Sequence, residues 1–243
     1  AWDIATGYAA ATALLAAERH RSRRGHGQLV KLALQDVALS ATAALGYLGE
    51  AEINGVDRPR FGNEVYGTFA RDFRTKDGRY VMICVFTDRQ LSALATAGGL
   101  SDAFARLEQA HSIDLRNVAH RWQVRAALAA IIEDWVGSLT LAETSTLLTD
   151  AGALWAPYKL PSELVAGDPL LTENSMFQRV EQPGIGTLWS STSPYEFLAC
   201  ERLAAQPAPT LGEHTDAILS DILGLSSGQI GRLHDDKVVA GPR

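Results

Sequence analysis

The sequence predicts an α/β protein, because helical patterns alternate with short apolar runs that have the character of strands. Residues 3–24 are rich in alanine and leucine and end in a basic turn before Gly25, which is typical of a helix and its C-terminal cap. Residues 29–34 alternate weakly and favour a strand, and residues 35–48 favour a second helix. Together these segments predict one end of an α/β layer.

A second α/β unit is expected after a long connection at residues 52–74, which is rich in turn-forming Asn, Gly and Pro. The run at residues 79–86 follows an Asp-Gly turn and is strongly apolar, so it predicts a buried strand. A strand at residues 153–158 and a hairpin at 176–189, turning at Pro183-Gly184, could pair with it. Helices are expected at residues 88–97, 121–136, 140–148 and 214–223, and from residue 226 onward.

Composition indicates a packed globular protein and excludes several classes of function. The 243 residues are 47% hydrophobic and 21% charged, which argues against intrinsic disorder. The net charge of −6 argues against general nucleic-acid binding, because that function needs a basic face. No apolar run reaches the roughly 18 to 20 residues needed to cross a bilayer, and no signal-peptide pattern is present. We therefore expect a cytoplasmic protein that binds no membrane, with Cys84 and Cys200 as reduced, buried thiols.

The residues support few kinds of catalysis by themselves. His20 and His26 lack helical i,i+4 spacing and no carboxylate or cysteine cluster joins them, so no metal site is expected. No serine lies in a Gly-x-Ser-x-Gly setting, and neither cysteine lies beside a plausible base. Residues 25–28 are glycine-rich, but they follow a helix and precede the expected strand, the reverse of the order in phosphate-binding loops.

Asp3 is the carboxylate of most interest, and two interpretations of it stay open. One is a helix N-cap. The other is a nucleophile, because the helix dipole and free backbone N–H groups hold a carboxylate at a helix N-terminus in its ionised form. Gly7, Ala9 and Ala10 would leave space for a ligand beside it.

Three separated blocks of sequence resemble the family III CoA-transferases, the group that includes formyl-CoA transferase, carnitine CoA-transferase and α-methylacyl-CoA racemase. The blocks lie at residues 3–39, 62–83 and 211–239. In the first block the family pattern is Asp-x-x-x-Gly, an Ala/Leu-rich helix, Gly-x-Gly-Gln, a strand and an Asp. The matching positions here are Asp3, Gly7, Gly25, Gly27, Gln28 and Asp36.

The resemblance implies a domain organisation over the whole chain. Residues 1–50 would be the end of a Rossmann-like large domain, 51–74 a linker and active-site loop, 75–190 a small α/β domain with a short sheet, and 191–243 a C-terminal linker with helices that return to the large domain. Family members form interlocked homodimers. Their N-terminal region supplies most contacts to the adenine and phosphates of CoA, and that region is expected to be missing from this chain, so we expect the chain alone to bind CoA weakly.

The resemblance also implies the chemistry. The family's catalytic aspartate falls on Asp3, whose carboxylate would attack an acyl-CoA thioester and then carry CoA as an aspartyl thioester until a carboxylate accepts it. Coenzyme A would take part as a moiety of the substrate, and no permanently bound cofactor and no metal would be needed.

Departures from the family pattern narrow the implied activity. The glycine run that forms a mobile lid in formyl-CoA transferase is replaced by bulkier residues after Gly62-Asn63, and Thr87 stands where the racemases carry a glutamate. The stretches at residues 1–7, 17–21, 60–73 and 77–83 most resemble family members that move CoA from C1 to C4 of mesaconyl-CoA. The resemblance therefore implies an intramolecular transfer, which fits a closed loop because the free acid need not leave the site. The alternatives are an α-methylacyl-CoA racemase, an intermolecular acyl-CoA:carboxylate CoA-transferase and a non-catalytic fragment.

Five residues are candidates for binding the acyl-CoA. Leu34 falls where the family has a residue near the pantetheine of CoA. Tyr66, Gly67 and Phe69 would form the closed loop that excludes water from the reaction. Arg71, or alternatively Arg74, could hold the distal carboxylate of the substrate, although a solvated or ion-paired surface arginine is the other interpretation.

Overall fold

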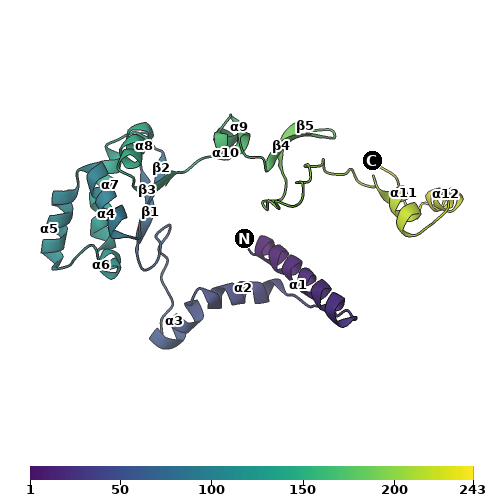
Figure 1. Cartoon of the computed structure of the whole chain (residues 1–243), viewed down its shortest axis with the longest axis horizontal. Helices are drawn as coiled ribbons and strands as arrows, with labels where there is room; N and C mark the ends of the chain where they lie inside the picture. Colours follow the sequence, from purple (N-terminus) through teal and green to yellow (C-terminus); the bar gives the residue numbers. More distant parts are fainter. Residues whose placement is uncertain (243) are drawn as a thin grey trace. The chain divides into compact units, whose positions relative to one another are not determined.

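A computed structural model describes residues 1–242 and divides the chain into two compact units, Ala1–Ala156 and Pro157–Arg243. Figure 1 labels the helices and strands in chain order. The expected domain boundaries after residues 50, 74 and 190 stay predictions.

The first unit begins with three helices, α1 (Trp2–Arg24), α2 (Leu34–Ala44) and α3 (Tyr47–Asn54). Helix α1 ends as predicted at Gly25, whose φ of 81° is left-handed and whose amide donates to the Arg21 carbonyl at 2.8 Å. The predicted helix at residues 35–48 is interrupted because Gly46 is also left-handed, with φ 82°.

The predicted strand at residues 29–34 is wrong. Residues 26–33 have no regular structure and α2 begins at Leu34. Among the described residues no strand pairs with this segment, so its backbone lacks the ladder that a strand requires, and Leu29 is 83% exposed.

A three-stranded sheet forms the centre of the first unit, in the order β1 (Phe69–Arg74), β2 (Tyr80–Val85) and β3 (Leu154–Pro157). Strands β1 and β2 are antiparallel, with Phe69 opposite Val85 and Arg74 opposite Tyr80. Strand β2 and its pairing with β3 confirm the prediction. Strand β1 lies in what was predicted to be a connection. It forms because Phe69 and Phe73 lie four positions apart, so both side chains point to the buried face of the sheet.

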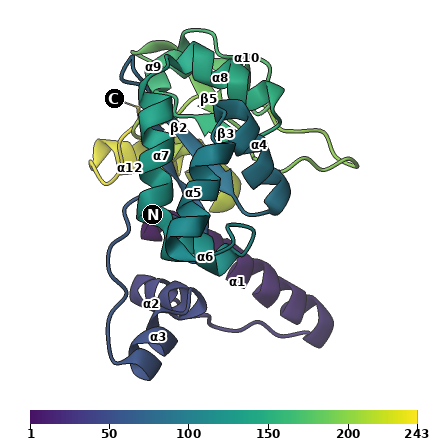
Figure 2. The ribbon, with the colours of Figure 1, turned by 90° about the vertical axis from the view of Figure 1, so that its left-hand side faces the viewer.

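Five helices follow the second strand: α4 (Asp88–Gly98), α5 (Ser101–His111), α6 (Val118–Gln123), α7 (Arg125–Gly137) and α8 (Leu141–Asp150). Helices α4 and α8 confirm the prediction, and capping boxes at Thr87 and Thr140 start them. Helix α5 was not predicted, and the predicted helix at residues 121–136 is two helices that meet at Val124. In Figure 2, α4, α5 and α7 lie in front of β2 and β3.

The hydrophobic core lies between this sheet and these helices. Leu128, Ile132 and Val136 follow one face of α7 and are fully buried, as are Val81 and Ile83 of β2. Burying each such side chain stabilises the fold by about 1.5–3 kcal/mol. We call β1–β3 with α4–α8 the sheet-and-helix core, and it is the rigid support for the cluster described below.

The turn between β1 and β2 is joined to the start of α8 through Asp77. Its Oδ1 accepts hydrogen bonds from the Thr75 hydroxyl at 2.5 Å and from the Leu141 amide at 3.1 Å. The Thr75 hydroxyl above all stabilises the carboxylate and lowers the pKa of Asp77 below its ordinary value of 3.8.

We expect the stabilising effect of Asp77 to depend on pH. Because its folded-state pKa is lowered, the ionised carboxylate stabilises the fold at neutral pH, and this contribution is lost as the pH falls through the folded-state pKa. Asp77→Asn should lower the urea midpoint at pH 7, and its difference from the unsubstituted protein should shrink below pH about 4. Asp102→Asn, in the exposed first turn of α5, is the control. A difference that stays constant from pH 7 to pH 3 would contradict this role of the charge.

The second unit contains short helices and a hairpin: α9 (Pro161–Val165), α10 (Pro169–Thr172), β4 (Phe177–Gln182), β5 (Gly186–Ser191), α11 (Thr215–Ala217), the π-helical η1 (Ile218–Ile222) and α12 (Ser227–Asp235). The hairpin, its turn and the helix after Ser226 confirm the prediction. The suggested pairing of the hairpin with the strand at 79–86 is wrong, because β4 and β5 form a separate sheet.

The two cysteines differ in their surroundings. Cys84 lies part-buried in β2, and burial raises the pKa of its thiol. Cys200 was predicted to be buried, but it is exposed and lies in a bend outside the helices and strands. Both are free thiols.

Candidate active site

Asp3 lies in the first turn of α1 and is exposed. Ala1, not Asp3, is the N-cap residue, so the simple capping interpretation does not hold. Among residues 1–242 the Asp3 carboxylate has no hydrogen bond or ion pair. Gly7 follows one turn later on the same face of the helix, and a side chain there would meet nothing within 4 Å.

Three rings gather where the loop before β1 meets α6. Phe61, Tyr66 and Trp122 make all three pairwise contacts, with ring centroids 5.0 Å apart for Phe61–Trp122, 5.1 Å for Tyr66–Trp122 and 5.7 Å for Phe61–Tyr66. We call these residues the aromatic cluster. Trp122 comes from α6, so the cluster attaches the loop to the sheet-and-helix core.

Arg58 fastens the other side of the same loop to α3. Its guanidinium lies between two tyrosine rings, 4.2 Å from the centroid of Tyr47 and 4.0 Å from that of Tyr66. Its Nε donates to Glu50 at 2.6 Å, and the Tyr66 hydroxyl donates to the other oxygen of Glu50 at 3.2 Å. The hydrogen bond to Glu50 is the main reason that the pKa of Arg58 is raised. Tyr66 is thus held by contacts to two helices.

Glu64, in the middle of this loop, is shared by two arginines. Its Oε2 is 3.2 Å from Nε of Arg125, the first residue of α7, and its Oε1 is 3.7 Å from Nη1 of Arg71 in β1. Arg71 lies on the face of β1 that also carries Phe69 and Phe73. Arg71 is thus part-buried and ion-paired, as its second interpretation expected, and its role toward a substrate stays a prediction.

A cavity of about 730 Å³ lies beside these residues, lined among others by Tyr47, Arg58, Phe61, Glu64 and Tyr66. Of the predicted binding residues, Tyr66 lines this cavity, and Arg71 is ion-paired to Glu64, which also lines it. Gly67 follows Tyr66 and has a left-handed φ of 81°. Phe69 is 1% exposed and packs in the core, and Leu34 begins α2 and is 44% exposed. No hydrogen bond, ion pair or ring contact joins Asp3 or Leu34 to the aromatic cluster among the described residues.

Sequence reasoning did not find Glu50, Arg58, Glu64, Trp122 or Arg125 as members of this group. Trp122 lies in a segment for which only a helix was predicted, and Arg125 and Glu64 are separated by 61 positions. Only the concentration of arginines and aromatic residues at 58–74 hinted at such a cluster.

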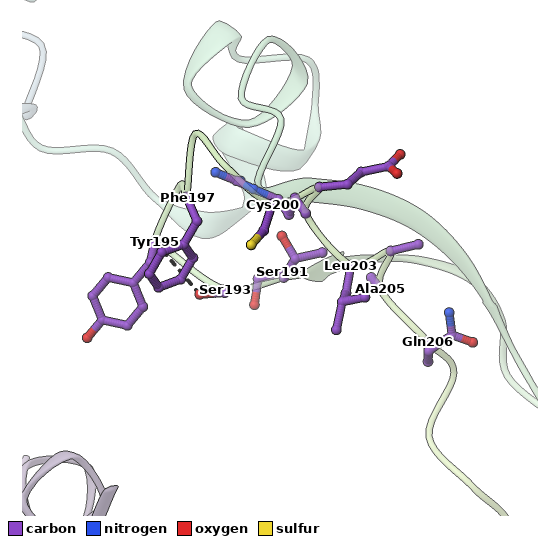
Figure 3. Close-up of a pocket in the computed structure, with 12 residues that line it drawn as sticks. Ser191, Ser193, Tyr195, Phe197, Cys200, Leu203, Ala205 and Gln206 are labelled. Atoms are coloured by element: carbon purple, nitrogen blue, oxygen red, sulfur yellow. Dashed lines mark hydrogen bonds between the residues drawn. The ribbon is translucent and has the colours of Figure 1, made fainter. Parts of the chain in front are cut away.

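A second cavity, of about 650 Å³, lies in the second unit. Figure 3 shows Tyr195 and Phe197 side by side on one part of its lining, with Cys200 and Leu203 on the following segment. None of the predicted site residues lines it.

Within residues 1–242 no three His, Cys, Asp or Glu residues are placed to hold a metal ion. No helix in the same range is both long and apolar enough to span a membrane.

Comparison with known proteins identifies the family. The family model of CoA-transferase family III matches residues 1–215. The chain belongs to CoA-transferase family III, which confirms the resemblance carried by the three sequence blocks and the expected α/β class.

Individual relatives agree with this assignment. The chain is 49% identical over 243 residues to a 2-methylfumaryl-CoA isomerase of Chloroflexus aurantiacus, covering 100% of this chain and 59% of the relative. It is 26% identical over 262 residues to a formyl-CoA:oxalate CoA-transferase of Rhodopseudomonas palustris, covering 99% of this chain and 60% of the relative. The chain thus spans about 60% of the length of these curated relatives.

A solved structure has the same fold. The crystal structure of Rv3272 from M. tuberculosis in its orthorhombic form superposes with a TM-score of 0.64 at 25% identity, covering 87% of this chain and 53% of that chain.

Proposed function

We propose that the protein carrying this chain moves CoA between carboxylates through a covalent intermediate on Asp3, most specifically from C1 to C4 of mesaconyl-CoA. The observation that carries this proposal is the 49% identity, over the full chain, to an enzyme named 2-methylfumaryl-CoA isomerase. Mesaconyl-CoA is 2-methylfumaryl-CoA, so that name describes the same molecule. The open, unpaired carboxylate of Asp3 supports the chemistry.

The proposed reaction conserves charge and needs no oxidant. An Asp3 carboxylate oxygen bonds to the thioester carbonyl carbon, the C–S bond breaks, CoA leaves as a thiolate, and Asp3 and the acid remain joined as a mixed anhydride. The thiolate attacks the Asp3 carbonyl and releases the C1 carboxylate of the acid, leaving CoA on Asp3 as a thioester. The C4 carboxylate then repeats these steps in reverse, and Asp3 is regenerated as a carboxylate.

The loop described above supports an intramolecular reaction. Tyr66 is held by Arg58, Glu50 and the aromatic cluster rather than by a flexible glycine run. In the proposal this packed loop keeps water from the anhydride, with Gly67 allowing its turn and Phe69 fixing its end in the core. Arg71 binds the free carboxylate of the substrate, and Leu34 lies near the pantetheine.

Thr87 argues against racemase chemistry. It stands where the racemases carry a glutamate, and here its hydroxyl accepts from the Gln90 amide at 3.3 Å as the cap of α4. Thr87 therefore caps a helix and offers no carboxyl group for racemase chemistry.

Intermolecular transfer is the second candidate, because the chain is also 29% identical to a succinyl-CoA--L-malate CoA-transferase beta subunit from Chloroflexus aurantiacus.

The proposal also covers the cofactor, the cellular location and the assembly of the enzyme. CoA takes part only as a moiety of the substrate, and the working form is a cytoplasmic, interlocked homodimer. A further N-terminal portion of the family fold supplies the contacts to the adenine and phosphates of CoA.

Mass spectrometry of the Asp3 peptide tests the function. After incubation of the full-length protein with mesaconyl-CoA, we expect CoA attached to Asp3 and conversion of the adduct to a hydroxamate by hydroxylamine. Deuterium exchange at the α-carbon of a saturated 2-methylacyl-CoA, tested in a separate incubation because C2 of mesaconyl-CoA carries no hydrogen, would without an adduct instead indicate a racemase. Absence of both would show that the proposed function is wrong.

A further inference from the structure

The Glu64 carboxylate lies between two guanidinium groups that come from rigid elements on either side. Arg71 belongs to β1 and Arg125 begins α7, whereas Glu64 belongs to the loop before β1. The three side chains are 30%, 32% and 22% exposed, respectively. Among residues 1–242 neither arginine has another carboxylate partner, so one negative charge faces two positive charges.

Aromatic rings hold both guanidinium groups in place. Arg125 lies 4.0 Å from the centroid of Trp122, and its Nη1 donates to the Trp122 carbonyl at 3.0 Å. Arg71 lies 5.4 Å from the ring of Phe73. Rings on one side of a guanidinium restrict its movement and reduce its contact with water, which strengthens its attraction for a carboxylate.

Glu64 lines both the open cavity and the crevice that contains the two arginines, whereas neither arginine lines the open cavity. It lines the cavity of about 730 Å³. It also lines a narrow crevice with Arg71, Trp122 and Arg125, which has no space for a water-sized group. A ligand carboxylate that enters from the cavity would therefore meet Glu64 first.

We propose that Arg71 and Arg125 together bind the free carboxylate of a dicarboxylyl thioester, and that Glu64 is an internal occupant which this carboxylate replaces. The inference rests on the proposed function and adds Arg125 and Glu64 to it. Two guanidinium groups match the two oxygens of one carboxylate, and Glu64 shows the arrangement with a carboxylate of the protein itself. Because Glu64 lies on a loop, it can withdraw without disrupting a strand or helix.

The exchange would make the site selective. A dicarboxylyl thioester brings a carboxylate that takes the place of Glu64 and leaves no guanidinium unpaired. An acyl thioester without a second carboxylate offers nothing to the two arginines, so Glu64 keeps the crevice closed. Arg125 and Glu64 are therefore specificity-determining residues in this proposal.

Calorimetric binding of free mesaconate to the full-length protein tests the exchange without requiring turnover. Glu64→Gln should bind mesaconate about fivefold more tightly, because a competing carboxylate is removed. Arg125→Gln and Arg71→Gln should each weaken binding about tenfold or more. The uncharged dimethyl ester of mesaconate should not bind to any of these proteins.

Asp114→Asn is the matched control, because Asp114 is also a loop carboxylate ion-paired to an arginine, Arg116, at 3.6 Å. It should leave mesaconate affinity unchanged. If Arg125→Gln does not fold, Arg125→Lys keeps the charge, loses the paired donors and should still weaken binding.

The inference is overturned if Glu64→Gln leaves mesaconate affinity unchanged or weaker, if Arg125→Gln binds like the unsubstituted protein, or if mesaconate does not bind at all. An Asp3 adduct together with any of these results would leave the proposed function standing. The expected binding pattern without an Asp3 adduct would support the arginine site and contradict CoA transfer.

Discussion

Asp3→Ala is expected to lower the rate of CoA transfer by about 10⁴-fold or more, because removing a nucleophile eliminates the covalent route. The substitution should also abolish the CoA adduct detected by mass spectrometry. Binding of acyl-CoA should change little, since Asp3 has no hydrogen bond or ion pair with the described residues whose loss would alter the fold. The kcat for conversion of mesaconyl-CoA in the full-length protein is the measurement.

Asp102→Ala is the matched control for this substitution. Asp102 is the second residue of α5, as Asp3 is the second residue of α1, and both are exposed carboxylates in a first helical turn. Each replacement removes the same favourable interaction with the helix dipole, about 0.3–1 kcal/mol, so any general effect on stability is shared. Full activity of Asp3→Ala would rule out the covalent mechanism.

The part of this site that could be predicted was the part encoded in local sequence. Asp3 was singled out by a motif that keeps its spacing along one helix, with Gly7 one turn later and Gly25 at the helix end, and its catalytic role stays a prediction. Residues 79–86 and 88–97 were predicted correctly, because an apolar run after an Asp-Gly turn and the helical pattern that follows it are local signals.

The part that could not be predicted depends on contacts between distant segments. Arg125 and Glu64 meet only because β1 lies beside α7, and β1 itself was hidden among turn-forming residues. The prediction of a strand at residues 29–34 failed for the opposite reason. The local pattern favoured a strand, but no strand among the described residues pairs with this segment. In both cases the tertiary environment decided the outcome, and local propensity did not.

The environment of Arg121 is another feature that local sequence could not predict. It was predicted only as part of an amphipathic helix, yet its side chain is 1% exposed. Its Nη1 donates to the Leu115 carbonyl at 2.7 Å and to the Arg116 carbonyl at 3.1 Å, and its Nη2 donates to the Phe86 carbonyl at 3.2 Å. Burial lowers the pKa of Arg121, and the nearby Asp88 carboxylate, 3.8 Å away, opposes this effect.

Arg121→Met should therefore destabilise the sheet-and-helix core by at least about 1–3 kcal/mol, the cost of leaving one buried carbonyl oxygen without a donor. Methionine fills much of the volume but donates no hydrogen bond, so the three carbonyl oxygens that Arg121 now satisfies would lose their donor in a buried site. The end of β2 and the loop before α6 would lose the group that joins them. Urea denaturation at pH 7 measures this loss, with Arg116→Met as the control, because Arg116 is 75% exposed and its replacement should change stability by less than about 0.5 kcal/mol. Equal stability of the two variants would mean that Arg121 only fills space, and that water or a backbone shift satisfies the carbonyl groups in its absence.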